Sequence, residues 1–184
     1  MLIEHAFIVL TDGQNPYWNI QMATEHGDTG SSQALSKALE VSLSFADDYD
    51  AIIAIYDHDN AGISEYKRLE RDYNEIIPNT LKKHKNANVY IICLPVPGEM
   101  DKYLRTKQEF NFFEIEHYFP ELYLKEKDMV KDLDIPGLYE IKTKKKMEFA
   151  KDVCKSTDPQ LFKYFKDLFD IIDKVTNTRI EYIV

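Results

Sequence analysis

Residues 51–63 read AIIAIYDHDNAGI, and this stretch decides the class of fold. Its first six residues are apolar, which is typical of a strand buried on both faces of a sheet. Asp57 and Asp59 follow directly, and Gly62 permits a sharp turn into a segment with a helical pattern. In sheets flanked by helices, ligands bind beyond the carboxyl ends of the strands. We therefore expect a functional site at Asp57 and Asp59.

The segments around this strand alternate between strand and helix patterns. A second buried strand is predicted at residues 89–94 (VYIICL), where Pro95 ends the run. Shorter strands are expected at residues 7–10 and 18–24, and helices at 33–46, 63–84, 110–119, 146–154 and 159–175. This alternation predicts an α/β fold with a mostly parallel sheet of about four strands, flanked by helices. We expect an α/β domain at residues 1–125 and a C-terminal helical extension at 126–184 packed on it. A single domain over residues 1–184 is the alternative.

The composition limits the class of protein. The chain has 184 residues and a formal net charge of −9, which argues against a general nucleic-acid coat protein because such proteins are basic. No apolar run reaches the ~18 residues of a membrane span, and we expect no signal peptide. Cys93 and Cys154 lack CxxC spacing, which favours reduced thiols in a cytoplasmic protein.

The acidic residues have the chemistry of a divalent-metal site. Mg²⁺ and Mn²⁺ take oxygen ligands, and Mg²⁺ usually keeps several waters, so two or three carboxylates suffice. Asp12 follows the predicted strand at 7–10, and we expect it to meet Asp57 and Asp59 at one edge of the sheet. The Cys and His spacing of a zinc site is missing. An Asp-x-Asp pair is not specific, however, since it also occurs in ordinary acidic loops.

Three further residues near this site have a structural interpretation. His58 lies between the two aspartates, and we expect its ring to point away from a metal. His117 is interpreted as a residue at the edge of the core, and Cys93, inside a predicted strand, as a core residue rather than a nucleophile.

Residues 51–63 resemble the Asp-x-Asp segment of Toprim domains, which occur in bacterial primases, topoisomerases, recombination proteins and OLD-family (overcoming lysogenization defect) nucleases. The acidic residue and glycine that end the first strand of that family are matched by Asp12 and Gly13, with Asp in place of the usual Glu. Residues 113–119 (FEIEHYF) resemble the segment that supplies another acidic group in the OLD-like branch, matched by Glu116. Residues 146–150 (KMEFA) resemble a later helix whose lysine faces phosphate, matched by Lys146.

The resemblance implies a Toprim-like, Rossmann-like fold and a nuclease that depends on Mg²⁺ or Mn²⁺. Asp12, Asp57, Asp59 and Glu116 would be the metal ligands and, with Lys146, the catalytic residues. The implied substrate is nucleic acid, DNA rather than RNA, with a role in defence against phage or plasmid DNA. A separate ATPase partner domain and a homodimer are compatible with the resemblance, and no membrane partner is expected.

Two other functions remain open. The first alternative to the nuclease is a non-catalytic, degenerate Toprim relative that binds a partner or nucleotide, because Asp12 is one methylene shorter than the usual Glu. A receiver- or phosphatase-like domain would use Asp57 as a phosphoryl acceptor, but such folds add a Thr or Ser and a Lys at later strand ends, and residues 94–97 show neither clearly. Convergence of the four carboxylates would favour the metal site.

Overall fold

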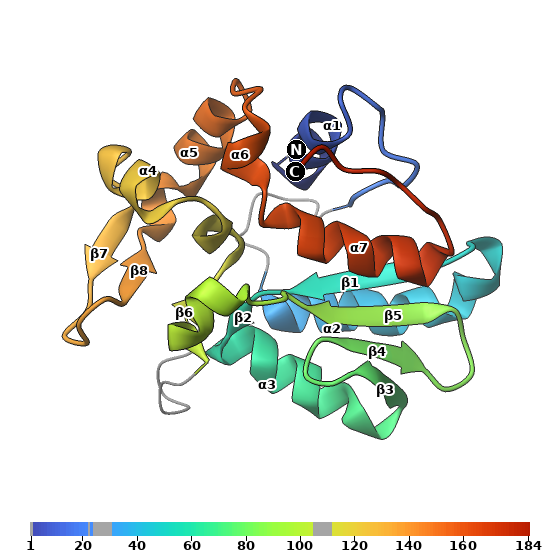
Figure 1. Cartoon of the computed structure of the whole chain (residues 1–184). Coiled ribbons are helices and arrows are strands. Elements are labelled where there is room, and N and C mark those ends of the chain that lie inside the picture. The colour runs from blue at the N-terminus through green and yellow to red at the C-terminus, as the bar shows by residue number, and fades with distance from the viewer. Residues whose placement is uncertain (1, 22, 24–30, 105–111) are drawn as a thin grey trace.

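The computed structural model describes residues 2–21, 23, 31–104 and 112–184 of the chain (Figure 1). Its strands are β1 (Ile52–Tyr56), β2 (His58–Asp59), β3 (Tyr73–Ile77), β4 (Leu81–His84), β5 (Val89–Cys93), β6 (Phe112–Phe113), β7 (Val130–Asp132) and β8 (Tyr139–Ile141). Its α-helices are α1 (Leu2–Leu10), α2 (Ser32–Ser42), α3 (Asn60–Arg68), α4 (Glu121–Glu126), α5 (Lys146–Val153), α6 (Pro159–Phe162) and α7 (Phe165–Thr176). Short 3₁₀ helices are η1 (Leu43–Asp48), η2 (Leu69–Arg71), η3 (Gly98–Tyr103), η5 (Ile115–Tyr118) and η6 (Thr143–Lys145).

The centre of the fold is a four-stranded sheet with the order β1-β5-β4-β3. Strands β1 and β5 pair in parallel, whereas β4 pairs antiparallel with both β5 and β3. The α/β class is as predicted, but the expected mostly parallel sheet is wrong, because half of the sheet is an antiparallel hairpin. The predicted buried strands at 51–56 and 89–94 are the parallel pair.

The hairpin β3–β4 arises from a segment for which the charge pattern predicts a helix. Helix α3 ends at Arg68, and the chain then turns back at Asn79, which has a φ of 56°. Pro78 before it cannot donate a backbone hydrogen bond, which favours a turn over a continued helix. Tyr73 and His84 are paired across the hairpin with ring centroids 5.1 Å apart, and β4 also pairs with β5. Tertiary packing thus overrides a local helical pattern here.

Helices cover both faces of the sheet. Ala54 and Ile91 belong to a core cluster on the side of α2 and α3, whereas Ile92 belongs to the larger cluster on the side of α7 (Figure 1). Successive strand residues point to opposite faces, so apolar residues at every position are explained by burial on both sides.

Residues 7–10 belong to helix α1, and their prediction as a strand is wrong. The run FIVL is too short to distinguish a strand from a buried helical segment by periodicity. Leu2, Ala6, Phe7 and Leu10 show the helical spacing, and α1 packs against α6 and α7. Residues 18–21 form no strand either, and residues 22 and 24 of that prediction lie outside the described part of the chain.

The C-terminal third is held by an aromatic core. The prediction at 146–154 is confirmed by α5, and the segment 159–175 forms two helices, α6 and α7, rather than one. At 110–119, residues 110 and 111 are outside the described part, and the rest forms β6 and η5 instead of a regular helix. One core cluster includes Ile92, Leu124 and Phe169, so it contains residues from both sides of the predicted boundary at 125. The division into two domains stays a prediction.

Among the helices of the described residues, none combines the length and apolar character required to cross a bilayer.

Candidate functional site

Asp57 lies at the carboxyl end of β1, where a short ribbon brings a distant segment beside it. Strand β2 pairs antiparallel with β6, which places His58 opposite Phe113. The Ile115 backbone N–H then donates a hydrogen bond to Asp57 Oδ1 at 3.1 Å. This ribbon therefore joins the Asp-x-Asp turn to the Glu-x-Glu segment at 114–116.

Asp59 and Gly62 shape the start of helix α3. Asp59 is the N-cap, and its Oδ1 accepts a hydrogen bond from the Gly62 N–H at 2.7 Å. A Cβ at Gly62 would lie 2.0 Å from the Asp57 carbonyl oxygen, so the close approach requires glycine. Asp59 thus has a structural role as a cap, and a carboxylate has a second oxygen with which to bind a ligand.

Glu114, Glu116 and Lys146 form a partly buried ion-pair cluster. Lys146 is the first residue of α5, and its Nζ lies 2.9 Å from Glu114 Oε2 and 3.2 Å from Glu116 Oε2. The Glu116 side chain is only 8% exposed. A single ammonium is thus paired with two carboxylates. The negative charge of Asp59 also raises the pKa of Asp57 and of Glu114.

The carboxylates of the cluster outnumber the positive charge that compensates them. Burial raises the pKa of Asp57 to about 7; Lys146 opposes this shift, while Glu116, Glu114 and Asp59 reinforce it. Burial likewise raises the pKa of Glu114, again opposed by Lys146. Burial disfavours the Lys146 ammonium, but Glu116 and Glu114 outweigh it and raise the pKa of Lys146 above its usual range. Such an excess of negative charge is a common property of functional sites.

The structure brings four of the five predicted site residues together and leaves Asp12 apart from them. Asp57, Asp59, Glu116 and Lys146 gather at one end of β1, and Glu114 joins them. The sequence resemblance assigns the acidic role in this segment to Glu116 alone, although Glu114 belongs to the same segment. The Glu-x-Glu spacing next to an extended segment was the available signal.

Asp12 is not at a strand end, contrary to prediction. It is exposed and follows helix α1, with a φ of 54°, and the Gly13 N–H donates a hydrogen bond to the Ile8 carbonyl at 2.8 Å. This arrangement is a helix C-cap, in which Asp12 takes the left-handed position and Gly13 follows it. Asp12 is not among the charges that most affect Asp57. The sequence Asp-Gly therefore ends a helix here.

The neighbouring histidines and Cys93 have partners in the backbone or the core. His58 Nδ1 lies 3.1 Å from the Leu94 carbonyl oxygen at the end of β5. His117 is fully buried rather than at the edge of the core. Cys93 is buried too, and burial raises the pKa of its thiol to about 12, as befits a core residue.

The residues present are chemically suited to a hard divalent cation, although no ligand set is ready-made. Within the described ranges, no three acidic, His or Cys side chains already stand close enough together to hold a metal. Lys146 lies between Glu114 and Glu116 instead. The Glu114 and Glu116 oxygens that face it are buried, and among the described residues neither accepts a well-aligned hydrogen bond. An all-oxygen donor set with uncompensated negative charge fits Mg²⁺ or Mn²⁺.

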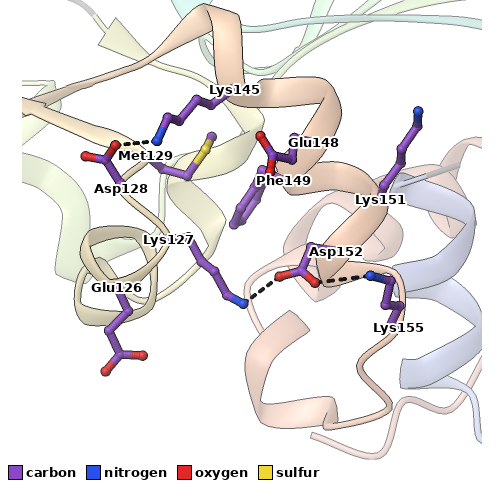
Figure 2. Close-up of a pocket in the computed structure, with 10 residues that line it drawn as sticks. All are labelled: Glu126, Lys127, Asp128, Met129, Lys145, Glu148, Phe149, Lys151, Asp152 and Lys155. Carbon is purple, nitrogen blue, oxygen red and sulfur yellow. Dashed lines mark hydrogen bonds and ion pairs between the residues drawn. The ribbon is translucent and has the colours of Figure 1, made fainter.

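A pocket lies along α5, and the charges that line it are balanced. The pocket of about 490 Å³ is lined by lysines and carboxylates from α4, α5 and the segments beside them (Figure 2). Lys127 and Lys155 both pair with Asp152, at 2.5 and 3.4 Å, and Lys145 pairs with Asp128 (Figure 2). Lys142 also pairs with Asp128, at 2.6 Å. The basic run at 142–146 is thus largely neutralised by acidic side chains, and this pocket offers no net attraction for phosphate.

The chain matches no protein-family model, no curated protein and no solved structure. The Toprim resemblance therefore rests on the residues quoted above.

Proposed function

We propose that the protein is a Toprim-like, metal-dependent nuclease that hydrolyses phosphodiester bonds of nucleic acid. The observation that supports it most is the pairing of Glu114 and Glu116 with Lys146, in a segment whose Ile115 N–H donates to Asp57 at the carboxyl end of β1. These residues come from three separate segments, and all of them lie where the α/β fold places ligands. DNA is the proposed substrate, with defence against foreign DNA as the proposed role.

In this proposal, Asp57, Asp59, Glu114 and Glu116 would hold Mg²⁺ or Mn²⁺. The ion, when bound, supplies a Lewis acid that activates water and neutralises phosphate charge. Lys146 stays protonated at neutral pH because the glutamates raise its pKa, so it provides a fixed positive charge for a phosphate oxygen. Asp12, which caps α1, has no part in this site. The proposed ligand set therefore replaces Asp12 with Glu114.

The test is a Mn²⁺ titration by calorimetry, followed by cleavage of supercoiled plasmid in the same buffer. The wild type should bind Mn²⁺ and nick the plasmid, and Asp57→Asn and Glu116→Gln should lose both. Asp59→Asn separates the two roles of Asp59, because asparagine is as good an N-cap as aspartate. We expect this variant to keep its stability and to bind Mn²⁺ more weakly.

Asp128→Asn is the matched control, since it removes an exposed carboxylate that pairs with lysines outside the cluster. It should leave metal binding and nicking unchanged. No Mn²⁺ binding by the wild type at millimolar metal would overturn the proposed function.

A non-catalytic binding module is the second candidate. It is favoured by the position of Asp12 in a helix cap and by the pairing of Lys146 with the glutamates in place of a ready-made ligand set. Mn²⁺ binding without nicking, in the presence of nucleic acid, would support this candidate or a requirement for the ATPase partner.

A further inference from the structure

His117 is a polar residue in one of the most apolar environments of the molecule. It is 0% exposed, and its ring stacks with Phe113 and Tyr139, at centroid distances of 5.4 and 5.1 Å. The Tyr103 ring meets it edge-on at 4.7 Å. A leucine would fill such a space without the cost of burying a polar ring. The imidazole must therefore contribute something that an apolar side chain lacks.

Its two nitrogens join two backbone segments. The Glu114 N–H donates a hydrogen bond to His117 Nδ1 at 3.0 Å. Nδ1 also lies 3.3 Å from the Glu114 carbonyl oxygen, but its shorter contact with the N–H assigns it as an acceptor. The proton of the neutral ring is then on Nε2, which lies 3.3 Å from the Tyr139 carbonyl oxygen and can donate to it.

The next backbone amide, that of Ile115, is also held by a hydrogen bond. The Ile115 N–H donates to Asp57, so successive amides of this turn are held by His117 and by Asp57. Glu114 and Glu116, which meet Lys146, lie on either side of Ile115. The orientation of the turn therefore decides where both carboxylates point.

We propose that His117 is a positioning residue, which holds the turn at 114–116 so that Glu114 and Glu116 face Lys146 and Asp57. The effect on metal affinity rests on the proposed function, whereas the effect on the turn does not. Hydrogen-bonded groups behind metal ligands set the ligands' direction, and their loss typically weakens metal binding by roughly 10–100-fold.

The experiment uses variants that remove one hydrogen bond at a time. His117→Leu fills the space and removes both bonds. In His117→Asn, the amide oxygen takes the place of Nδ1 and can accept from Glu114, but the side chain is too short for Tyr139. In His117→Gln, the amide nitrogen can reach Tyr139 while the acceptor for Glu114 is lost. Phe162→Leu is the control for lost packing, since Phe162 is fully buried in the same aromatic core.

Mn²⁺ affinity is measured by calorimetry on all variants of the full chain. We expect His117→Leu and His117→Gln to bind Mn²⁺ roughly 10–100-fold more weakly than the wild type. His117→Asn should restore most of the affinity, and Phe162→Leu should match the wild type. If His117→Leu fails to fold, the comparison of His117→Asn with His117→Gln decides in its place.

Hydrogen exchange of residues 112–118 in metal-free protein gives a readout that is independent of metal. Exchange at Glu114 and Ile115 should accelerate at least tenfold in His117→Leu and His117→Gln and stay near the wild-type rate in His117→Asn. A wild type that binds no Mn²⁺ overturns the proposed function, and hydrogen exchange alone then decides on His117. Equal exchange rates in His117→Asn and His117→Gln would overturn the positioning role. A loss of Mn²⁺ affinity in Phe162→Leu in proportion to its loss of stability would overturn it too.

Discussion

Two adjacent residues of the same strand region, Tyr56 and Asp57, belong to two polar clusters with opposite electrostatics. On the side of α2 and α3, Ser36 Oγ lies 2.9 Å from the Tyr56 hydroxyl and donates to Glu65 Oε2 at 2.7 Å. Arg68 Nε donates to the same oxygen at 2.8 Å. Around Asp57, by contrast, Lys146 is the cation shared by the buried Glu116 and the partly buried Glu114.

The difference is visible in the direction of the pKa shifts. Hydrogen bonds from Ser36 and Arg68 lower the pKa of Glu65, because its charged form has the donors that it needs. Burial raises the pKa of Asp57 and of Glu114, because their charged forms are poorly compensated. Matched donors indicate a structural network, whereas uncompensated carboxylates are the groups for which we propose a bound cation.

The largest effect is expected from removal of Lys146. Lys146→Met leaves the buried Glu116 and the partly buried Glu114 without their cation. It should lower the free energy of unfolding of metal-free protein by about 3 kcal/mol at pH 8, the lower end of the range for fully buried pairs. Mn²⁺ binding should be tighter than in the wild type, because the competing ammonium is gone, and nicking should be lost. Urea unfolding and calorimetry measure these effects.

Lys145→Met is the control, since Lys145 precedes Lys146 and pairs with the exposed Asp128. A surface pair of this kind contributes little to stability, because water screens it. Equal losses of stability in the two variants would contradict the contrast between the cluster and the surface.

The second effect is the pH dependence of the free energy of unfolding that arises from Asp57. Burial raises its pKa to about 7 in the folded chain, from an ordinary value of 3.8. Because the folded-state value is raised, the stability that comes with the protonated form is present below about pH 4 and is lost as the pH rises through 7. Asp57→Asn should therefore have a free energy of unfolding about 1–4 kcal/mol higher than the wild type at pH 8, measured by urea unfolding. This difference should shrink toward pH 4.

Asp50→Asn, on the exposed segment before β1, serves as the control for a lost negative charge. Its unfolding free energy should follow the wild type at both pH values. Parallel pH curves for Asp57→Asn and the wild type would refute the uncompensated burial of Asp57.

The smallest effect tests the matched network, and its pH dependence has the opposite sign. Ser36→Ala removes a donor to the charged Glu65, which should cost about 1.5–3 kcal/mol at pH 7. The pKa of Glu65 is lowered from 4.5, so this contribution is present above pH 4.5 and is lost as the pH falls through the folded-state pKa.

Ser44→Ala is the control for Ser36→Ala, because Ser44 is an exposed serine with a local backbone partner. Urea unfolding at pH 7 and pH 3 should show a loss for Ser36→Ala that is larger at pH 7. A loss that is equal at both pH values would show that Ser36 acts by packing alone.

Part of the fold and of the site could be predicted from local sequence. The apolar runs at 51–56 and 89–94 form the parallel pair, and the stripe at 159–175 lies in helices. The run FIVL was ambiguous by itself, and Asp12-Gly13 is as good a helix end as a strand end. The hairpin β3–β4 was missed because charged residues on its exposed positions resemble a helix surface.

The sequence by itself determined the α/β class, the strand that ends in Asp57 and Asp59, and the need for Gly62 at the turn. These features are local, since they depend on apolar runs, caps and close backbone approach. Only the tertiary structure decided that Asp12 lies apart, that Glu114 belongs to the cluster and that His117 holds its turn. These features depend on contacts between distant residues: Ile115 bonds Asp57 across 58 positions, and no local pattern encodes such a pairing. Burial then sets the electrostatics, because it decides which carboxylates keep water and which must share Lys146.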